Sequence, residues 1–405
     1  MDLKQARFVP ERAVERTIDT LPDKRAKIEN ALKNYLGDPE SLRNLERLFD
    51  KSGYVYDHGA LLKGLMEPSS YMVLDGGKRV RPLTTMFIID ALGGDSRRLV
   101  EFAIIPEVVH NGTLILDDIQ DGSETRRGKD AVHKKFGLDI GSNLGVFLQT
   151  FPVVATIDSD KIDEKTKKRM LAMWARETTR VTIGQAIDIV WHRQEVDPRK
   201  ITEEKYLQMA LDKNGTLKMA AQLGAILAGA SDEVLEAMGR FGARFGVAFQ
   251  LQDDVLNLEK SRVTASKGKI GDDITEGKIS LLVVYTLQQA PKEVGDELVG
   301  ILKEHTREPQ KIRRAIEILK SYDAVERVRE LQRRMVSEAF AILDNTLPLS
   351  PERVTLKMFV DVLVFGRPSE GAKFSPYPDW LLRHPKPGPI SWRRETAPEW
   401  LTGLS

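Results

Sequence analysis

Helical periodicity runs through almost the whole chain, and it is the feature that most limits the fold. In residues 232–258 apolar side chains recur at every third or fourth position, and Ser231 stands where an N-cap is expected. Similar spacing occurs in residues 100–120, 164–192, 203–230, 278–290, 311–345 and 353–365. The sequence nowhere sustains the period-two alternation of a half-buried strand. It therefore predicts an all-α fold.

Proline and tryptophan content divides the chain into three parts. We expect one large helical domain over residues 25–365, preceded by an N-terminal segment of residues 1–24. From Gly366 onward there are seven Pro and three of the five Trp. So many Pro exclude a long helix. Residues 366–405 are therefore predicted to form a Pro/Trp-rich C-terminal tail of undetermined role.

Charge balance and the lack of cysteine exclude several classes of protein. Lys and Arg number 61 and Asp and Glu number 60, which is not the basic excess of a nucleic-acid binder. No Cys is present, so disulfides and thiolate metal sites are excluded, and with 6 His a metal site is expected to use carboxylates, which favour Mg²⁺. The N-terminus lacks the apolar stretch of a secretory signal, and no run of about 18 apolar residues occurs. We therefore expect a cytoplasmic protein without a transmembrane anchor.

Two acidic motifs adjoin apolar helical stretches. Asp117 and Asp121 fall one turn apart on one helix face, and residues 253–257, beginning with Asp253, repeat that geometry with a final Asn. Two carboxylates at this spacing repel each other, but they can bind Mg²⁺ and leave coordination positions for phosphate oxygens. One such motif could be a solvated helix end; two favour a metal cage. His110, two turns before Asp117 on nearly the same face, is compatible with a core residue or a functional one.

Basic residues accompany both acidic motifs. Lys78 and Arg81 follow a Gly pair and share one side of a helix that begins there, and Arg126 and Arg127 follow the first acidic motif. Three lysines lie near the other elements: Lys213, Lys267 and Lys278. Basic clusters are commonly solvated faces. Beside two Mg²⁺-type motifs, they indicate a diphosphate held by metal on one side and by Arg and Lys on the other.

Taken together, these elements resemble the trans-isoprenyl diphosphate synthases, the polyprenyl synthetase family. The segments that agree in order and spacing are GGKRVRP at 76–82, HNGTLILDDIQDGSETRRGKDAVHKKFG at 110–137, KNGT at 213–216, FQLQDDVLNL at 249–258 and GDDITEGKISLL at 271–282. The resemblance is dense over residues 50–290 and is nearest to geranylgeranyl-type members. It thins through residues 291–365 and does not cover the tail.

The resemblance implies a fold and a reaction. The fold is the isoprenoid synthase fold, a single helical bundle around a deep central cavity, found as a homodimer. The reaction is that of a prenyltransferase in isoprenoid and lipid biosynthesis, which joins isopentenyl diphosphate to an allylic diphosphate head to tail and in trans. The allylic diphosphate ionises beside Mg²⁺ ions, about three per site, the isopentenyl double bond attacks the allylic cation, and a proton is lost, with pyrophosphate as its expected acceptor.

The resemblance also assigns roles to individual residues. Asp117, Asp121 and Asp253 would bind the metal ions, with Asp118 and Asp254 as supports. The residues expected at the allylic diphosphate are Arg126, Lys213, Lys267 and Lys278, with Gln250 nearby. Those expected at isopentenyl diphosphate are Lys78, Arg81, His110 and Arg127.

The sequence departs from the family pattern at one substrate-binding position, and it carries one indication of the length of the product chain. Asn214 occupies the position where the family usually has Thr; Asn is larger but can donate a similar hydrogen bond to substrate. Thr113 lies one turn from Asp117 on the cavity side, whereas the relevance of Gly112 comes from the family alone. Both are small where members that stop at fifteen carbons carry aromatic residues. The expected product is therefore geranylgeranyl diphosphate, with a longer polyprenyl diphosphate as the alternative.

Two other functions remain open at this stage. A class I terpene cyclase shares the fold and the first acidic motif, but it has no need of the basic segment at residues 76–82. A weakly active or regulatory subunit of a prenyl synthase would be expected to lose its acidic motifs, and both are kept here. The preferred allylic starter cannot be deduced from the sequence.

Overall fold

The described parts of the chain are helical apart from one short hairpin. The computed structural model describes residues 20–36, 56–258 and 271–365. Its strands β1 (Thr125–Arg126) and β2 (Lys129–Asp130) pair antiparallel. The predicted all-α fold is confirmed. The predicted tail of residues 366–405 and residues 1–19 of the predicted N-terminal segment lie outside the described residues.

The described residues form twenty helical segments and two strands that follow one another along the chain. In chain order they are α2 (Leu21–Leu36), α4 (His58–Leu61), η1 (Leu62–Met66), α5 (Glu67–Val73), α6 (Val80–Ala91), α7 (Val100–Ala103), α8 (Ile105–Gln120), α9 (Val132–Phe136), α10 (Leu138–Ile157), α11 (Glu164–His192), η2 (Pro198–Lys200), α12 (Glu203–Lys213), α13 (Gly215–Leu227), α14 (Asp232–Asn257), α16 (Asp272–Thr275), α17 (Leu281–Gln289), α18 (Lys292–Lys303), α19 (Pro309–Ser321), α20 (Ala324–Thr346) and α21 (Pro351–Phe365). Helix α2 begins ahead of the predicted domain boundary at residue 25, and Leu21 is buried. The division into three parts stays a prediction.

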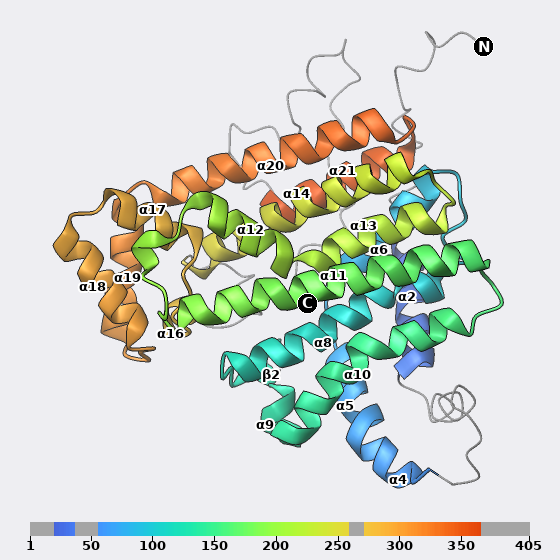
Figure 1. Cartoon of the computed structure of the whole chain (residues 1–405), viewed down its shortest axis with the longest axis horizontal. Helices are drawn as coiled ribbons and strands as arrows, with labels where there is room; N and C mark the ends of the chain where they lie inside the picture. The colour runs from blue at the N-terminus through green and yellow to red at the C-terminus, as the bar shows by residue number, and fades with distance from the viewer. Residues whose placement is uncertain (1–19, 37–55, 259–270, 366–405) are drawn as a thin grey trace.

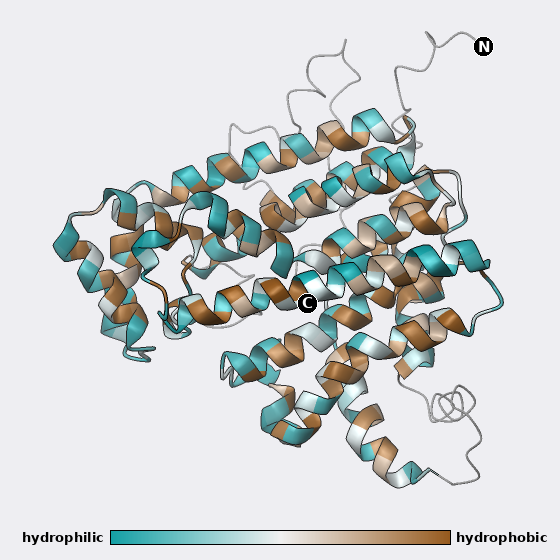
Figure 2. Cartoon of the chain, viewed as in Figure 1, coloured by the Kyte–Doolittle hydropathy of each residue, from teal (hydrophilic) through white to brown (hydrophobic). Residues whose placement is uncertain are grey.

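Long helices pack side by side in a bundle (Figure 1). Helix α14 packs against both α13 and α20, α8 lies along α10, and α11 contacts α12 and α13. In Figure 2 most helices carry both hydrophobic and hydrophilic residues, as expected for helices with one face in a core.

Polar side chains fix the starts of three long helices. Ser231, Asp163 and Thr202 precede α14, α11 and α12, and each accepts a hydrogen bond from the backbone N–H three residues ahead. These bonds satisfy amide groups that have no partner inside the helix. The N-cap predicted at Ser231 is confirmed.

A second, smaller hydrophobic cluster lies apart from the main core. Its buried members are Phe102, Ile105, Val109, Met170, Met173, Met219, Leu223 and Ile226. It therefore joins α7 and α8 to the first half of α11 and to α13. At their other ends α8 and α11 meet again, where Gln185 Nε2 donates to Asp117 Oδ1 at 2.8 Å. The two helices thus run in the same direction, with an apolar cluster at one end and a polar contact at the other.

Helix α10 is unusually apolar. Among the described helices it is the one whose length and composition would suffice to cross a membrane, with a mean hydropathy of 1.4 over its best window. Core helices meet the same test, and α10 packs along α8. On its other side Leu138, Val146 and Ile157 are about half exposed.

Candidate active site

The first acidic motif lies at the end of α8. Asp117 and Asp118 are in its last turn, and Asp121 is the C-cap with backbone angles that still belong to the helical region. The predicted one-turn spacing is therefore kept. The Asp118 side chain is completely buried, the Asp121 side chain is 4% exposed and the Asp117 side chain is 20% exposed. Asp117 thus presents the most accessible carboxylate of the three.

Two lysines from distant segments meet this motif. Lys213 Nζ, at the end of α12, lies 3.2 Å from Asp117 Oδ1. Lys278 Nζ, just after α16, lies 2.7 Å from Asp121 Oδ2. Both lysines also bond to Asp188 Oδ2 of α11, with Lys278 at 3.0 Å. Asp188 is therefore the carboxylate that joins the two lysines.

Burial and charge have opposite effects on these carboxyl groups. Burial favours the protonated form of Asp188, but the charges of Lys213 and Lys278 outweigh it and lower the Asp188 pKa to about 2. The same balance holds the pKa of Asp117 below its usual range. For Asp121, burial and the charge of Asp117 prevail and raise the pKa to about 6. Negative charge is therefore not fully compensated at Asp121.

The donor groups of this motif fit a hard divalent cation. In the described segments no three His, Asp or Glu side chains gather closely enough to hold a metal ion by themselves. Among the residues that the structure describes, buried Asp121 Oδ1 nevertheless has no hydrogen-bond partner, and the nearby His192 Nδ1 is 3.9 Å away. Two carboxylates one turn apart with an unsatisfied oxygen are the kind of ligand that Mg²⁺ prefers.

The second acidic motif lies near the end of α14. Asp254 is 4% exposed and accepts hydrogen bonds from the Tyr206 hydroxyl and, at 2.9 Å, from Gln250 Nε2. Asp118 of the first motif is held in the same way by Arg126. In both motifs the second Asp is thus bonded within the protein, and the supporting role predicted for it stays a prediction. Burial lowers the pKa of Arg81, and the negative charge of Asp253 opposes this shift.

A short segment around α16 lies between the two motifs. Burial, followed by the charge of Asp254, raises the pKa of Asp273 well above its ordinary value. Burial, followed by the charges of Asp121 and Asp117, raises the pKa of Glu276 to about 7, although Lys278 opposes this. One segment thus interacts electrostatically with both acidic motifs, which brings them to the same site.

The adjacent residues Arg126 and Arg127, in the β1–β2 hairpin, direct their guanidinium groups toward different partners. Arg126 Nε donates to Asp118 Oδ1 at 2.9 Å, and Arg126 Nη2 lies 3.9 Å from Asp117 Oδ2. Arg127 has a positive φ of 55°, and its guanidinium donates to the Met72 carbonyl at 3.0 Å and to Asn111 Oδ1 at 3.2 Å. The Arg127 guanidinium therefore lies beside the glycine segment at residues 76–77, away from the lysines.

Arg81 and His110, two of the other residues predicted for isopentenyl diphosphate, lie close enough to Arg127 to feel its charge. Arg81 is buried, and its Nε donates to Thr216 Oγ1 at 2.8 Å. Burial, followed by the charges of Arg81 and Arg127, lowers the pKa of His110 well below its ordinary value. Lys78 lies in the loop before α6. The structure thus brings the charges of Arg81 and Arg127 to His110, and the role of these residues at isopentenyl diphosphate stays a prediction.

The neighbouring Arg79 has a different environment. It is fully buried, has a φ of 51° and pairs with Glu29 at 2.8 Å and Glu107 at 3.3 Å. Its guanidinium therefore fixes the loop to α2 and α8, which leaves Lys78 and Arg81 as the predicted ligands.

Asn214 belongs to a polar chain between α12 and α14. Its Nδ2 donates to the Ala210 carbonyl at 2.9 Å and to Gln250 Oε1 at 3.3 Å. Gln250 in turn donates to Asp254. The amide is therefore engaged inside the protein, and its predicted contact with substrate stays a prediction. Lys267 lies outside the described residues.

The two residues predicted to set chain length have different surroundings. Thr113 is half-buried, and its Oγ1 donates to the His110 carbonyl at 2.8 Å. A Cβ on Gly112 would lie 2.7 Å from the Gly145 carbonyl oxygen of α10. Gly112 is therefore at a close helix contact, turned away from Asp117 as its position on the helical wheel requires.

Sequence reasoning missed several residues of this site. Asp188 joins the lysines, Gln185 holds Asp117, and Tyr206 holds Asp254. The available signal was the one-turn spacing of Gln185 and Asp188 on a predicted helix. A buried acid on such a helix needs a cationic partner.

Comparisons with known proteins show what this chain is similar to in sequence and in fold. The family described as polyprenyl synthetase matches residues 62–319, more than half of the chain. A geranylgeranyl diphosphate synthase of Methanosarcina mazei is 30% identical over 74% of this chain and 89% of its own length. The crystal structure of geranylgeranyl pyrophosphate synthetase from Pyrococcus horikoshii superposes with a TM-score of 0.70 at 27% identity, over 87% of this chain and 98% of that one. A polyprenyl synthase from Caulobacter crescentus, complexed with calcium and isoprenyl diphosphate, gives 0.68 at 25% identity over 87% and 98%.

Proposed function

Because the chain belongs to the polyprenyl synthetase family, we propose that it condenses isopentenyl diphosphate with an allylic diphosphate, head to tail and in trans, to give geranylgeranyl diphosphate. The resemblance predicted from the sequence is confirmed, and the protein is an enzyme, a prenyltransferase of isoprenoid synthesis. The comparisons give no support to a class I terpene cyclase or to a regulatory subunit. The observation that carries the proposal is the joining of the first acidic motif to Lys213 and Lys278 through Asp188.

A divalent metal is part of this proposal. The Caulobacter crescentus relative was crystallised with calcium and isoprenyl diphosphate, and the unsatisfied oxygen of Asp121 fits such an ion. We infer Mg²⁺, three ions per site, held by Asp117, Asp121 and Asp253. When bound, these ions supply positive charge to the diphosphate leaving group.

The chain's own cations bind and orient the two substrates. Lys213, Lys278 and Arg126 lie around Asp117 and would take the allylic diphosphate, together with Lys267. Their present carboxylate partners hold the ammonium groups at the site before substrate arrives, which reduces the reorganisation needed for binding. The allylic carbon–oxygen bond then breaks with its electron pair leaving on pyrophosphate.

Isopentenyl diphosphate occupies the other basic group in this proposal. Arg81, Arg127, Lys78 and His110 bind its diphosphate, and because the pKa of His110 is low, the imidazole is neutral near pH 7 and acts as a hydrogen-bond donor. The isopentenyl double bond attacks the allylic cation. Loss of a proton to the departing pyrophosphate completes a chain that is five carbons longer.

Chain length and assembly are the finer parts of the proposal. Thr113 is small and lies one turn from Asp117, so a chain can pass this level and reach twenty carbons; a longer polyprenyl product is the alternative. We infer a homodimer formed through the apolar side of α10 that carries Leu138, Val146 and Ile157, because these three large apolar side chains are about half exposed. The enzyme is further proposed to be cytoplasmic and to bind no nucleic acid.

An assay of the purified full chain tests the proposal. The protein is incubated with Mg²⁺, isopentenyl diphosphate and dimethylallyl, geranyl or farnesyl diphosphate, and dephosphorylated products are sized by chromatography. We expect products lengthened by five-carbon steps and no reaction after chelation of the metal. A cyclase would instead release a cyclic hydrocarbon without isopentenyl diphosphate, and a regulatory subunit would be inactive alone. Light scattering of Val146→Glu tests the dimer, which this variant should dissociate.

A further inference from the structure

Helix α11 presents a row of three polar side chains to the first acidic motif. Gln185, Asp188 and His192 are spaced by three and four residues, so they lie on one face of the helix in successive turns. Gln185 Nε2 donates to Asp117 Oδ1 at 2.8 Å, and Asp188 accepts from the two lysines. His192 is the last residue of the helix, and it faces Asp121. The row therefore follows the acidic motif and reaches its last member with an imidazole.

The contact between His192 and Asp121 is incomplete. His192 Nδ1 lies 3.9 Å from Asp121 Oδ1, which is too far for a hydrogen bond. Within the described part of the chain both atoms are buried, and neither has a hydrogen-bond partner. The two side chains are only 7% and 4% exposed. Buried polar atoms without a partner are costly, so two that face each other indicate a ligand that both can bind.

The charges around these two atoms favour a cation. Asp121 Oδ2 already accepts from Lys278 Nζ at 2.7 Å, which leaves Oδ1 to face His192. Three carboxylates, those of Asp117, Asp121 and Asp188, share two ammonium groups, those of Lys213 and Lys278. One negative charge is therefore in excess next to the imidazole.

The two facing atoms are both metal ligands. Burial, followed by the charge of Lys278, lowers the pKa of His192 to about 4, so its imidazole is neutral near pH 7 and one ring nitrogen carries a lone pair. Two ligands that each lie about 2.1 Å from one ion can stand at most about 4.2 Å apart, and an approach of about 0.5 Å from the present 3.9 Å would give a tetrahedral angle. A single ion can therefore reach both atoms.

We propose that His192 Nδ1 and Asp121 Oδ1 bind one divalent cation together, and that this nitrogen ligand makes the position prefer Co²⁺ or Zn²⁺ to Mg²⁺. The inference rests on the metal role of Asp121 in the proposed function and adds a nitrogen to an otherwise all-oxygen set. Imidazole suits later transition metals and Zn²⁺, whereas Mg²⁺ prefers oxygen. Because no third His, Asp or Glu of the described residues is close enough to complete a site, further positions are left for water or diphosphate oxygens.

A purely structural role for His192 is the alternative. Its ring lies edge to face with that of His305, with ring centroids 6.4 Å apart. Such packing fixes the plane of the imidazole, but it does not explain why the unpartnered nitrogen faces an unpartnered carboxylate oxygen. The two roles differ in their consequences, because packing affects stability and a ligand affects which metal is bound.

Metal binding to the purified full chain, without substrates, tests the inference. Isothermal titration of the metal-free protein with Co²⁺ and with Mg²⁺ should give a tightest Co²⁺ site at least about tenfold stronger than the tightest Mg²⁺ site. Proton NMR of the Co²⁺-loaded protein should show one strongly shifted, exchangeable imidazole N–H resonance, which arises only from a histidine bound to the ion. His192→Gln should abolish this resonance and remove most of the preference for Co²⁺.

Two further variants separate ligation from packing. His192→Phe keeps a ring beside His305 but supplies no ligand, and it should behave like His192→Gln. His133→Gln is the matched control, because His133 Nδ1 is also buried without a partner in the described residues and lies near Asp118 of the same motif. This control should keep the shifted resonance and the preference for Co²⁺. Circular dichroism verifies the folding of each variant.

The results distinguish the inference from the function on which it rests. Unaltered protein without a shifted imidazole resonance would overturn the inference, and so would an unchanged resonance in folded His192→Gln or His192→Phe. Incorporation of isopentenyl diphosphate with Mg²⁺ is measured separately. Its absence in the unaltered enzyme would overturn the proposed function, while the cobalt measurement would still decide whether His192 is a ligand.

Discussion

The two ends of α8 are built on different principles. At the end that carries Asp117, side chains are held by directed bonds, with Lys213, Lys278 and Gln185 each bonded to a carboxylate. At the other end, around Ile105, the side chains are apolar and constrain each other by volume. Bonds between charges need precise geometry, whereas apolar packing tolerates exchange of one shape for another. The rate of reaction should therefore be set at one end and the length of product at the other.

The strongest test of this comparison removes a metal-binding carboxylate. Asp117→Ala or Asp253→Ala should lower turnover by about a thousandfold or more, because each removes negative charge that would hold cations at the leaving group. Steady-state rates with saturating substrates measure the loss. Asp160→Ala, a change at an exposed acid, is the control and should keep full activity. Near-normal turnover in a folded Asp117→Ala would refute the assignment of the charged end.

A smaller effect is expected at the carboxylate that joins the lysines. Asp188→Asn should reduce turnover by about a hundredfold, because two ammonium groups then lose their shared partner and repel each other. Product length should not change. Glu177→Gln is the matched control, since Glu177 is also buried on α11 and pairs with Lys218 at 2.7 Å. An equal loss of activity in Asp188→Asn and Glu177→Gln would contradict the claim that Asp188 contributes to turnover by joining the two lysines.

The charged end should itself divide into two substrate sites. Arg81→Ala should raise the KM for isopentenyl diphosphate, and Lys213→Ala the KM for the allylic substrate, each by about ten- to a hundredfold for one charged hydrogen bond. Titration of each substrate against each variant measures the four constants. Equal effects of both variants on both substrates would contradict the division.

The smallest effect on rate is expected for changes on the side of α8 that leads from Asp117 toward Ile105. Thr113→Phe should shorten the main product toward fifteen carbons with little change in incorporation, because a ring one turn from Asp117 occupies the space of an isoprene unit. Thr113→Val, which nearly keeps the volume, is the control for the lost hydroxyl. Unchanged product from Thr113→Phe would place the chain elsewhere, and a large loss of rate would show that the two ends of α8 are not separable.

The same contrast explains what the sequence could and could not predict. The acidic motifs, Lys213 and Lys278 can be recognised in the sequence, because charged residues beside apolar stretches need partners. The structure pairs both lysines with the first acidic motif. Asp188 lies in a long helix without a local motif. Its importance depends on Lys278, which is distant in sequence and becomes a neighbour only after folding.

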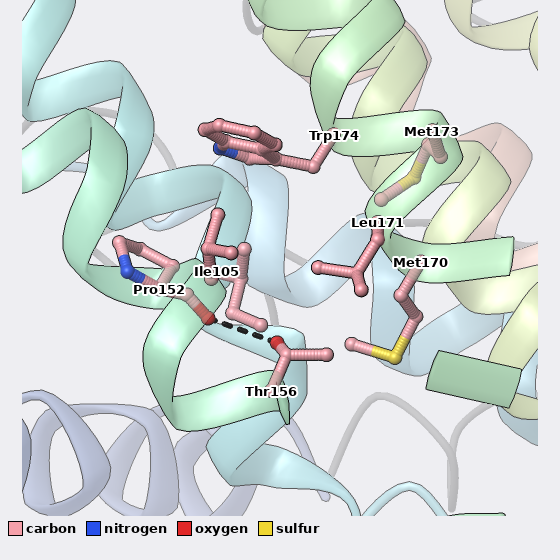
Figure 3. Close-up of a pocket in the computed structure, with 8 residues that line it drawn as sticks. Ile105, Pro152, Thr156, Met170, Leu171, Met173 and Trp174 are labelled. Atoms are coloured by element: carbon pink, nitrogen blue, oxygen red, sulfur yellow. Dashed lines mark hydrogen bonds between the residues drawn. The ribbon is translucent and has the colours of Figure 1, made fainter. Parts of the chain in front are cut away.

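Local backbone conformation and the packing of helices against one another explain other features that the sequence did not predict. Three basic residues stand in the segment at 78–81, and the left-handed backbone of Arg79 and its pairing with Glu29 and Glu107 decide which of them serves to fix the loop. Neither can be deduced from charge alone. One apolar pocket is lined by Ile105 of α8, Pro152 of α10 and Trp174 of α11 (Figure 3), so helical periodicity predicts the three helices but not the place where they meet. By contrast, the start of α14 at Ser231 is a local property and was predictable.

The close contact of Gly112 with Gly145 has a consequence for how this enzyme can evolve. A Cβ on Gly112 would stand 2.7 Å from the Gly145 carbonyl oxygen, and one on Gly145 would stand 2.6 Å from the Leu116 side chain. A single substitution at either glycine therefore forces α8 and α10 apart before it can alter the product. Thr113, one residue further along, is half-buried and already carries a side chain. Selection for shorter products can thus proceed by one step at Thr113, whereas Gly112 is accessible only through coupled changes on two helices, an epistatic barrier between neighbouring residues.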